Sequence, residues 1–204
     1  MDRMRLSVTD VDAWHYFRAQ EEGDMAAFLA RMRRQEPPTP QMRAGTAFHK
    51  AMETGAIGDG AAFTSQGHRY TVDFDAALSL PPVREVKVTR TQEVNGCEVT
   101  LVGKADGVDG TTIIDHKLTR SFVPDRYLDG FQWRAYLWLF AANRFRWNVF
   151  VGRPGRGEDW TDVRLVELHH LEAVAYDGLA RDVEASIADF VAMAREHLPE
   201  RLAA

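Results

Sequence analysis

The sequence predicts an α/β fold: a mixed β-sheet that contains a three-strand antiparallel meander and is flanked by helices. Between Val83 and Leu118 the hydrophobic pattern changes from the helical period to the period of two that is typical of half-buried strands. Two dipeptides with hairpin-turn composition, Asn95-Gly96 and Asp109-Gly110, divide this stretch into three segments. Helical patterns precede and follow it, as expected for helices that cover a sheet.

The elements follow from periodicity and from the turn residues between them. Prolines at 37–40 end the first helical region, and the helix that begins at Pro124 carries apolar residues around most of its circumference, so it should be largely buried. From Gly55 to Pro82 the pattern predicts no clear element. The expected elements are a helix from Ser7 or Thr9 to Pro37 with a break near Gly23, a helix over 41–53, strands over about 83–94, 97–108 and 111–118, a helix over 124–143, strands over 146–152 and 163–169, and a helix over 171–197.

Length and composition place the chain among ordinary globular proteins. It has 204 residues, of which 27% are charged, and we expect one domain over 1–204. The longest apolar run, Ala135–Ala142, is far shorter than the ~18 residues that a membrane span requires, and the first residues carry charges where a signal peptide would be apolar. We therefore expect a cytoplasmic protein without a membrane partner. Cys97 is the only cysteine, which excludes an internal disulfide and a four-cysteine metal site.

Charge is distributed unevenly along the chain. The formal net charge is −5, but the segment from His116 to Gly157 has eight Lys and Arg residues against two Asp, a local balance of +6. If the fold gathers this segment on one surface, a phosphate backbone could bind there. Arg120 and Arg134 are the candidates for such contacts. The alternative is a scattered, solvated set of charges.

The two turns determine which side chains share a face of the meander. With Asn95-Gly96 as a two-residue loop, Glu85 lies directly opposite Asp106. With Asp109-Gly110 as the second loop, Asp106 faces Ile113 and is diagonal to Asp115. Lys117 is two residues beyond Asp115 and points the same way. The pattern therefore predicts that four ionisable side chains converge at the open end of the meander.

Three neighbouring carboxylates and an ammonium are suited to bind a hard divalent cation and a phosphodiester. Facing residues have Cβ atoms ~4.5–5.5 Å apart, close enough for flexible carboxylates to share Mg²⁺. Without a cation these carboxylates would repel one another and the pKa of at least one would rise. A bound metal could lower the pKa of a water and stabilise the leaving oxygen. Taken alone, this spacing is also compatible with solvent-exposed charge at a sheet edge.

These residues lie in segments that resemble the PD-(D/E)XK nuclease superfamily, particularly its RecB-like branch and the recombination exonucleases of phages. The central segments are Gly103–Val108 and Ile113–Lys117. Gly45–His49 is similar to the histidine motif of that branch, and Gln132–Tyr136 matches its Q-x-x-x-Y helix. Leu6–Thr9 is similar to its N-terminal segment. Five segments in the expected order span about two-thirds of the chain, and the resemblance implies a restriction-endonuclease-like core.

The resemblance implies a role for each matching residue. Asp106 and Asp115 would bind Mg²⁺ or Mn²⁺, with the carbonyl of His116 as a further ligand and His49 as an additional one. Lys117 would position the attacking water or help to deprotonate it. Gln132 and Tyr136, one helical turn apart, would contact the DNA backbone or hold the catalytic motif in place. Glu85 is less regular in the family pattern, so its place in the site depends on the register.

The function implied is a metal-dependent DNA exonuclease acting in recombination or end processing, on double-stranded DNA with a free end. Similar phage enzymes form rings around DNA, and a homo-oligomeric ring and a single-strand annealing protein are the partners to test. A structure- or sequence-selective endonuclease of the same fold and a catalytically silent DNA-binding module are the alternatives. Gly103-Lys104 lacks the spacing and the Ser or Thr of a phosphate-binding loop, so we expect no ATP hydrolysis.

Overall fold

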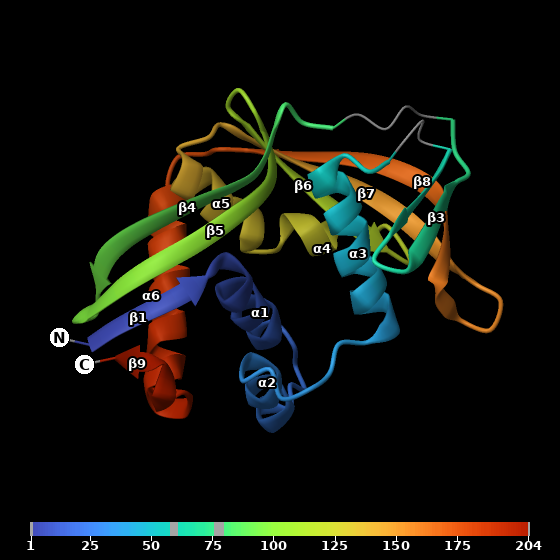
Figure 1. Cartoon of the computed structure of the whole chain (residues 1–204). Coiled ribbons are helices and arrows are strands. Elements are labelled where there is room, and N and C mark those ends of the chain that lie inside the picture. Colours follow the sequence, from blue (N-terminus) through green and yellow to red (C-terminus); the bar gives the residue numbers. More distant parts are fainter. Residues whose placement is uncertain (1, 58–60, 76–79, 204) are drawn as a thin grey trace.

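The computed structural model describes residues 2–57, 61–75 and 80–203 (Figure 1). Strands and helices alternate irregularly along the chain. In order they are β1 Asp2–Ser7, α1 Val8–Arg18, α2 Met25–Met32, α3 Pro40–Thr54, β2 Ala62–Ser65, β3 His68–Val72, β4 Val83–Val94, β5 Cys97–Asp109, β6 Thr112–Thr119, α4 Asp125–Leu128, α5 Gln132–Phe140, β7 Arg144–Gly155, β8 Asp159–Val174, α6 Leu179–His197, a 3₁₀ turn over Pro199–Arg201, and β9 Leu202–Ala203.

The strands form one mixed sheet in the order β2-β3-β8-β7-β6-β5-β1-β9, with β4 paired to β5 outside this path. The mixed α/β fold with flanking helices is confirmed. Helix α3 packs with β2, β3 and part of β7 and β8 through the core around Phe48 and Tyr70, while α1, α5 and α6 pack on the other core around Trp147 and Phe190. The sheet thus separates α3 from the remaining long helices (Figure 1).

The expected three-strand meander is present only in part. β4 pairs antiparallel with β5 along its length, in the predicted register from Val94↔Cys97 onward. β5 pairs antiparallel with β6 over only three residue pairs, 107–109 with 112–114. The reason is β1, which pairs parallel with β5 over 97–102 and occupies the edge that a full meander would give to β6.

The second turn lies one residue later in the chain than predicted, which shifts the pairing register of β5 and β6 by two residues. Asp109 pairs with Thr112, so the loop consists of Gly110 and Thr111, and Gly110 has the positive φ of +56° that this turn needs. A shift of two residues keeps every side chain on its predicted face. It also brings Asp106 next to Asp115 in register, where the prediction had Ile113.

Several other boundaries differ from the prediction. Ser7, one of the two expected capping residues, begins α1 through a capping box with Asp10. An unpredicted strand, β1, precedes this helix, and β2 and β3 lie in the stretch that had no prediction. The helix expected over 124–143 is divided into α4 and α5. β8 extends to Val174, so the last helix begins at Leu179 and not at Leu171. Within the described ranges, no helix is long and apolar enough to span a bilayer.

Candidate active site

The candidate site lies where β5 and β6 separate. Pairing between these strands stops at Gly107↔Ile114, and beyond this point the backbone N–H of His116 donates to Asp106 Oδ2 at 2.7 Å. The carboxylate of Asp106 therefore replaces the strand carbonyl that would otherwise accept this hydrogen bond. This fork opens space between the two strands and directs Asp106 toward β6.

Asp115 and Lys117 form the β6 side of the fork. Lys117 Nζ donates to Asp115 Oδ1 at 2.9 Å, and Gln132 Nε2 of α5 lies 3.3 Å from the same oxygen. Asp115 is only 6% exposed, and its second oxygen, Oδ2, is buried without a hydrogen-bond partner. A buried carboxylate oxygen without a partner is costly, which makes it a candidate ligand atom.

Helix α3 contributes His49 from the other side. The helix begins at its N-cap Thr39, ends at Gly55 and packs against β6, so His49 is held above the fork. Its Nδ1 lies 3.2 Å from Asp106 Oδ2. The structure thus brings together His49, Asp106, Asp115 and Lys117.

The electrostatics of the site follow from burial and from these pairings. Burial raises the pKa of Asp115 to about 6, although Lys117 opposes the shift. Burial would also raise the pKa of Asp106, but the hydrogen bond and charge of His49 outweigh it and lower that pKa. Asp106 in turn raises the pKa of His49 against the effect of burial. The pKa of Lys117 is likewise raised, because Asp115 and Asp106 outweigh its desolvation.

Helix α5 supports the site through a residue that the sequence pattern did not indicate. Asp12 of α1 accepts hydrogen bonds from the backbone N–H groups of Phe131 and Gln132, at 2.8 and 2.9 Å, and so caps the start of α5. One turn along, the hydroxyl of Tyr136 donates to the carbonyl of Lys104 at 2.7 Å. Gln132 and Tyr136 therefore contact β6 and β5 respectively.

Glu85 does not join the cluster in the predicted way. Its neighbours Arg84 and Val86 pair with Gly107 and Ala105, so it does lie across from Asp106. However, its backbone has a φ of +58°, in the left-handed region, and its carboxylate forms an ion pair with Lys104. The register argument located the residue correctly and could not indicate where the side chain points.

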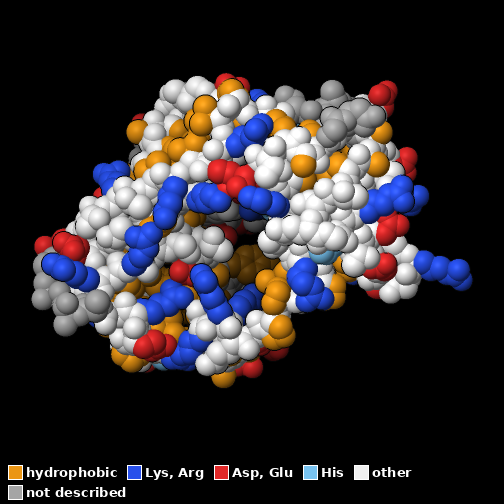
Figure 2. All heavy atoms as spheres, in the orientation of Figure 1, with side chains coloured by type: hydrophobic (Ala, Val, Ile, Leu, Met, Phe, Trp, Pro, Cys, Tyr) orange, Lys and Arg blue, Asp and Glu red, His pale blue; other side chains and the backbone are white. Residues whose placement is uncertain are grey.

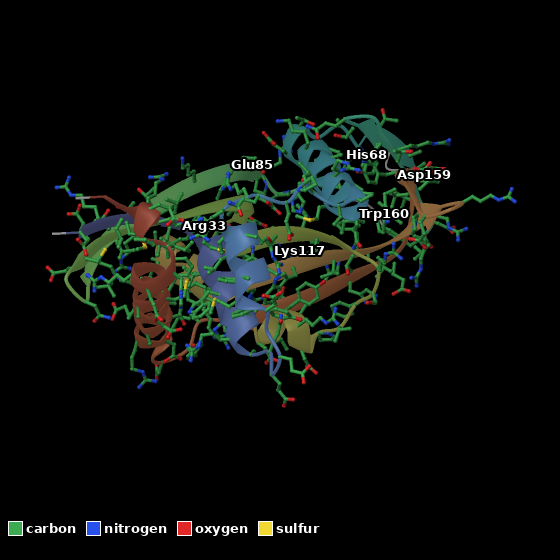
Figure 3. All side chains as sticks on the ribbon, turned by 90° about the horizontal axis from the view of Figure 1, so that it is seen from below. Arg33, His68, Glu85, Lys117, Asp159 and Trp160 are labelled. Carbon is green, nitrogen blue, oxygen red and sulfur yellow. The ribbon has the colours of Figure 1, made fainter. Side chains whose placement is uncertain are left out.

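The two candidate phosphate-binding arginines lie apart from the fork. Arg120 forms an ion pair with Glu158 and stacks over Trp160, which Figure 3 shows next to α3 and Asp159. Arg134 stacks over the ring of Trp133 and donates to the backbone carbonyls of Asp129 and Gly130. Two more cations of the basic segment, Arg144 and Arg146, pair with Glu172. Three of the eight cations of the predicted basic segment thus pair with acids that follow it in the sequence.

The surface is open toward the fork. Figure 3 shows Lys117 between the helices α2 and α3, and Figure 2 shows that the molecule is hollowed between the same helices, with Lys and Arg side chains around the hollow. A separate cavity of about 230 Å³ is lined by His116 of β6 and Asn148 of β7, among other residues. Because alternate strand residues point to opposite faces, that cavity lies behind the carboxylates.

The residues present suit a metal that takes few protein ligands. Among the described residues, no three His, Cys, Asp or Glu side chains are grouped as a complete metal site. Mg²⁺ commonly binds through one or two carboxylates and completes its shell with water and substrate phosphate. Asp106, Asp115 with its unpartnered Oδ2, and the carbonyl of His116 fit that requirement better than they fit a tetrahedral zinc site.

Comparison with known proteins identifies the fold. Neither family models nor curated protein sequences match this chain. Among solved structures, SSO0001 is 19% identical with a TM-score of 0.54 and covers 93% of this chain and 76% of its own. LHK-Exo, solved in complex with dAMP, is 13% identical with a TM-score of 0.52 and covers 94% and 88%. A protein from Eubacterium rectale described as a putative exonuclease is 10% identical with a TM-score of 0.52, and the match covers 93% of this chain and 79% of that protein. The chain therefore has the fold of these structures.

Proposed function

We propose that this protein is a metal-dependent DNA exonuclease that hydrolyses phosphodiester bonds in recombination or in the processing of DNA ends. The observation that carries the proposal is the fork between β5 and β6, which gathers Asp106, Asp115 and Lys117 next to His49. The shared fold supports the choice of reaction, because one of the neighbours is an exonuclease solved with a nucleotide.

Asp106 and Asp115 would hold Mg²⁺ or Mn²⁺, together with the carbonyl of His116. When bound, such a cation lowers the pKa of an attacking water and stabilises charge on the phosphate and leaving oxygens. It would also relieve the burial of Asp115, whose Oδ2 has no hydrogen-bond donor. His49 lies on the Asp106 side, where it orients that carboxylate and can serve as an additional ligand.

Lys117 has two possible roles, and its environment favours one of them. Two carboxylates raise its pKa, so the side chain is an ammonium at neutral pH. An ammonium donates hydrogen bonds and cannot accept a proton. Lys117 therefore positions the attacking water or a phosphate oxygen. Asp115 holds the Lys117 side chain in place, and Gln132 holds that of Asp115.

Cleavage of an end-labelled linear duplex in Mg²⁺, with the products sized over time, tests the proposal. Wild-type protein should release nucleotides or short products progressively from an end, and EDTA should stop the reaction. Asp115→Ala and Lys117→Ala should each abolish cleavage while leaving the far-UV circular dichroism unchanged. Wild-type turnover in both variants would refute the site.

Covalently closed circular DNA separates the two main alternatives. An enzyme that requires an end leaves circular DNA intact, whereas a structure- or sequence-selective endonuclease cuts it. A catalytically silent DNA-binding module would bind linear DNA and give no product in Mg²⁺ or Mn²⁺. The presence of both carboxylates and the lysine at the fork favours an active enzyme over this third outcome.

A further inference from the structure

A second polar pocket lies along the sheet from the fork, between β1, β5 and the chain that follows α2. Its volume is about 370 Å³, and it is lined by one acidic residue and three arginines among seven residues: Arg5, Leu6, Ser7, Asp10, Arg34, Val102 and Arg201. The two arginines Arg5 and Arg34 come from segments almost thirty residues apart in the sequence, and both are exposed. Folding therefore brings together in this pocket positive charges that are far apart in the sequence.

Two of the three arginines are available to a ligand. Arg201 is occupied, because its guanidinium donates to Asp10 at 3.0 Å and to the carbonyl of Met32 at 2.9 Å. Within the described part of the chain, Arg5 and Arg34 form no ion pair. Guanidinium groups without an acidic partner bind phosphate through paired hydrogen bonds.

The local structure adds a hydroxyl donor and a fixed backbone. Ser7 Oγ accepts the N–H of Asp10 in the α1 capping box, so its own hydrogen is free to donate into the pocket. Arg34 follows the end of α2 with a φ of +56°, a left-handed conformation that a residue with a side chain rarely adopts. This turn carries the Arg34 side chain to the pocket, where a helical continuation of α2 would carry it elsewhere.

The path between this pocket and the fork is polar and lacks aromatic residues. Val102 of the pocket and Asp106 of the fork are four residues apart on β5, at most about 13 Å, which corresponds to three or four nucleotides at ~3.4 Å of rise per nucleotide. Between them lie Lys104 and its cross-strand neighbour Lys87, both exposed. β1, β4 and β5 contain no aromatic residue, so they offer no platform for stacked bases.

We propose that Arg5, Arg34 and Ser7 bind one backbone phosphate of a DNA strand, three or four nucleotides from the phosphate at the fork. The inference rests on the proposed function for the position of the second phosphate. Recognition is of the backbone and independent of base sequence, because phosphate contacts position a protein on DNA without reading it. The outer face of β1 and β5 thus sets the direction in which the DNA leaves the site.

Binding measured without cleavage tests this pocket. The double variant Arg5→Ala/Arg34→Ala is compared with wild type by fluorescence anisotropy on a labelled duplex, in Ca²⁺ and over a range of NaCl concentrations. We expect the variant to bind about tenfold more weakly at low salt, and the slope of log K against log [NaCl] to fall by about 1. Arg181→Ala is the matched control, since that side chain is 82% exposed on α6 and pairs with Asp182. It should change affinity less than twofold.

Neutral methylphosphonates locate the contact. A single methylphosphonate three or four nucleotides from the cleaved bond should weaken binding by wild type and should have no further effect on the double variant. Equal affinity and salt slope in wild type and variant, or a methylphosphonate penalty that persists in the variant, would overturn the proposal. If the Arg-dependent contact is found and wild type nevertheless cleaves no DNA, the pocket stands and the nuclease proposal fails. If wild type cleaves and the variant binds normally, only the pocket fails.

Discussion

The two faces of β6 treat buried polar groups in opposite ways. On one face, Asp115 and Lys117 keep their charges next to Asp106 although Asp115 is almost fully buried. On the other face, burial lowers the pKa of His116 to about 4, so the ring is neutral. Its Nδ1 lies 3.3 Å from Asn148 Nδ2, and Asn148 Oδ1 lies 2.8 Å from Nδ1 of His170. We therefore expect substitutions on the charged face to affect cleavage and substitutions on the neutral face to affect stability.

Among the substitutions that test this comparison, Asp106→Asn should have the largest effect on the rate of cleavage. The amide keeps the shape of the side chain but removes the charge that pairs with His49 and would bind a cation. Loss of about 4 kcal/mol of transition-state stabilisation corresponds to roughly 10³-fold slower cleavage. Initial rates on the end-labelled duplex measure it, and a midpoint of urea unfolding close to that of wild type shows that the variant is folded. A rate within tenfold of wild type would remove Asp106 from the reaction.

The metal-free protein should reveal the energetic cost of burying Asp115. Its pKa is raised to about 6 in the folded protein, so between the usual value near 4 and pH 6 the folded state holds a proton that the unfolded state has released. The stabilisation that comes from protonated Asp115 is therefore fully present below its usual pKa near 4 and is lost as the pH rises through 6. Asp115→Asn lacks this titration, so it should gain stability relative to wild type between pH 4 and pH 7, by at most about 3 kcal/mol.

Urea unfolding in EDTA at several pH values measures this difference, with Glu167→Gln on the exposed part of β8 as a control for a general charge effect. Added Mg²⁺ should stabilise wild type and should not stabilise Asp115→Asn, because a ligand that binds only the folded state raises its stability. A stability difference that does not change with pH would show that the ion pair with Lys117 alone compensates for the burial of the Asp115 charge.

Asn148→Leu should affect stability more than catalysis. The substitution leaves Nδ1 of both His116 and His170 without a partner, and an unsatisfied buried polar group costs about 1–3 kcal/mol. Cleavage per folded molecule should change less than tenfold. His170→Gln, which retains a hydrogen-bonding group, should lose less stability. If Asn148→Leu abolishes cleavage in a fully folded protein, the two faces of β6 are not functionally separate.

Local patterns predicted most of this fold, and the errors occur where distant segments compete. The N-cap at Ser7, one of the two predicted capping residues, and the turn at Asn95-Gly96 depend on neighbouring residues only, and both agree with the prediction. β1 was not predicted, because six residues at the start of the chain become a strand only when β5 pairs with them. That pairing also shortens the contact between β5 and β6 and so produces the fork.

The predicted register indicated which residues meet at the fork, but it could not indicate the residues that support them. The second turn lies one residue later than predicted, and the resulting register shift of two residues leaves Asp106, Asp115 and Lys117 on their predicted faces. Asp12 caps α5 from more than a hundred residues away, and nothing in the surroundings of Asp12 in the sequence indicates that contact. Arg5 and Arg34 share a pocket for the same kind of reason, since only the folded chain brings them together.

The smallest expected effect concerns Glu85, which the register places across from Asp106 and the structure pairs with Lys104. Lys104 is 55% exposed, and an ion pair of this kind contributes at most about 1 kcal/mol. Glu85→Gln should therefore move the Mg²⁺ midpoint of cleavage less than about threefold if Glu85 acts only on Lys104. A direct metal ligand would move it by about tenfold or more.

The double variant Glu85→Gln/Lys104→Gln separates the two cases. If the ion pair is the whole role of Glu85, the double variant behaves like either single variant, because the two changes remove one interaction. If Glu85 also binds the metal, Glu85→Gln retains its effect in the Lys104→Gln background, and the carboxylate cluster is larger than the fork.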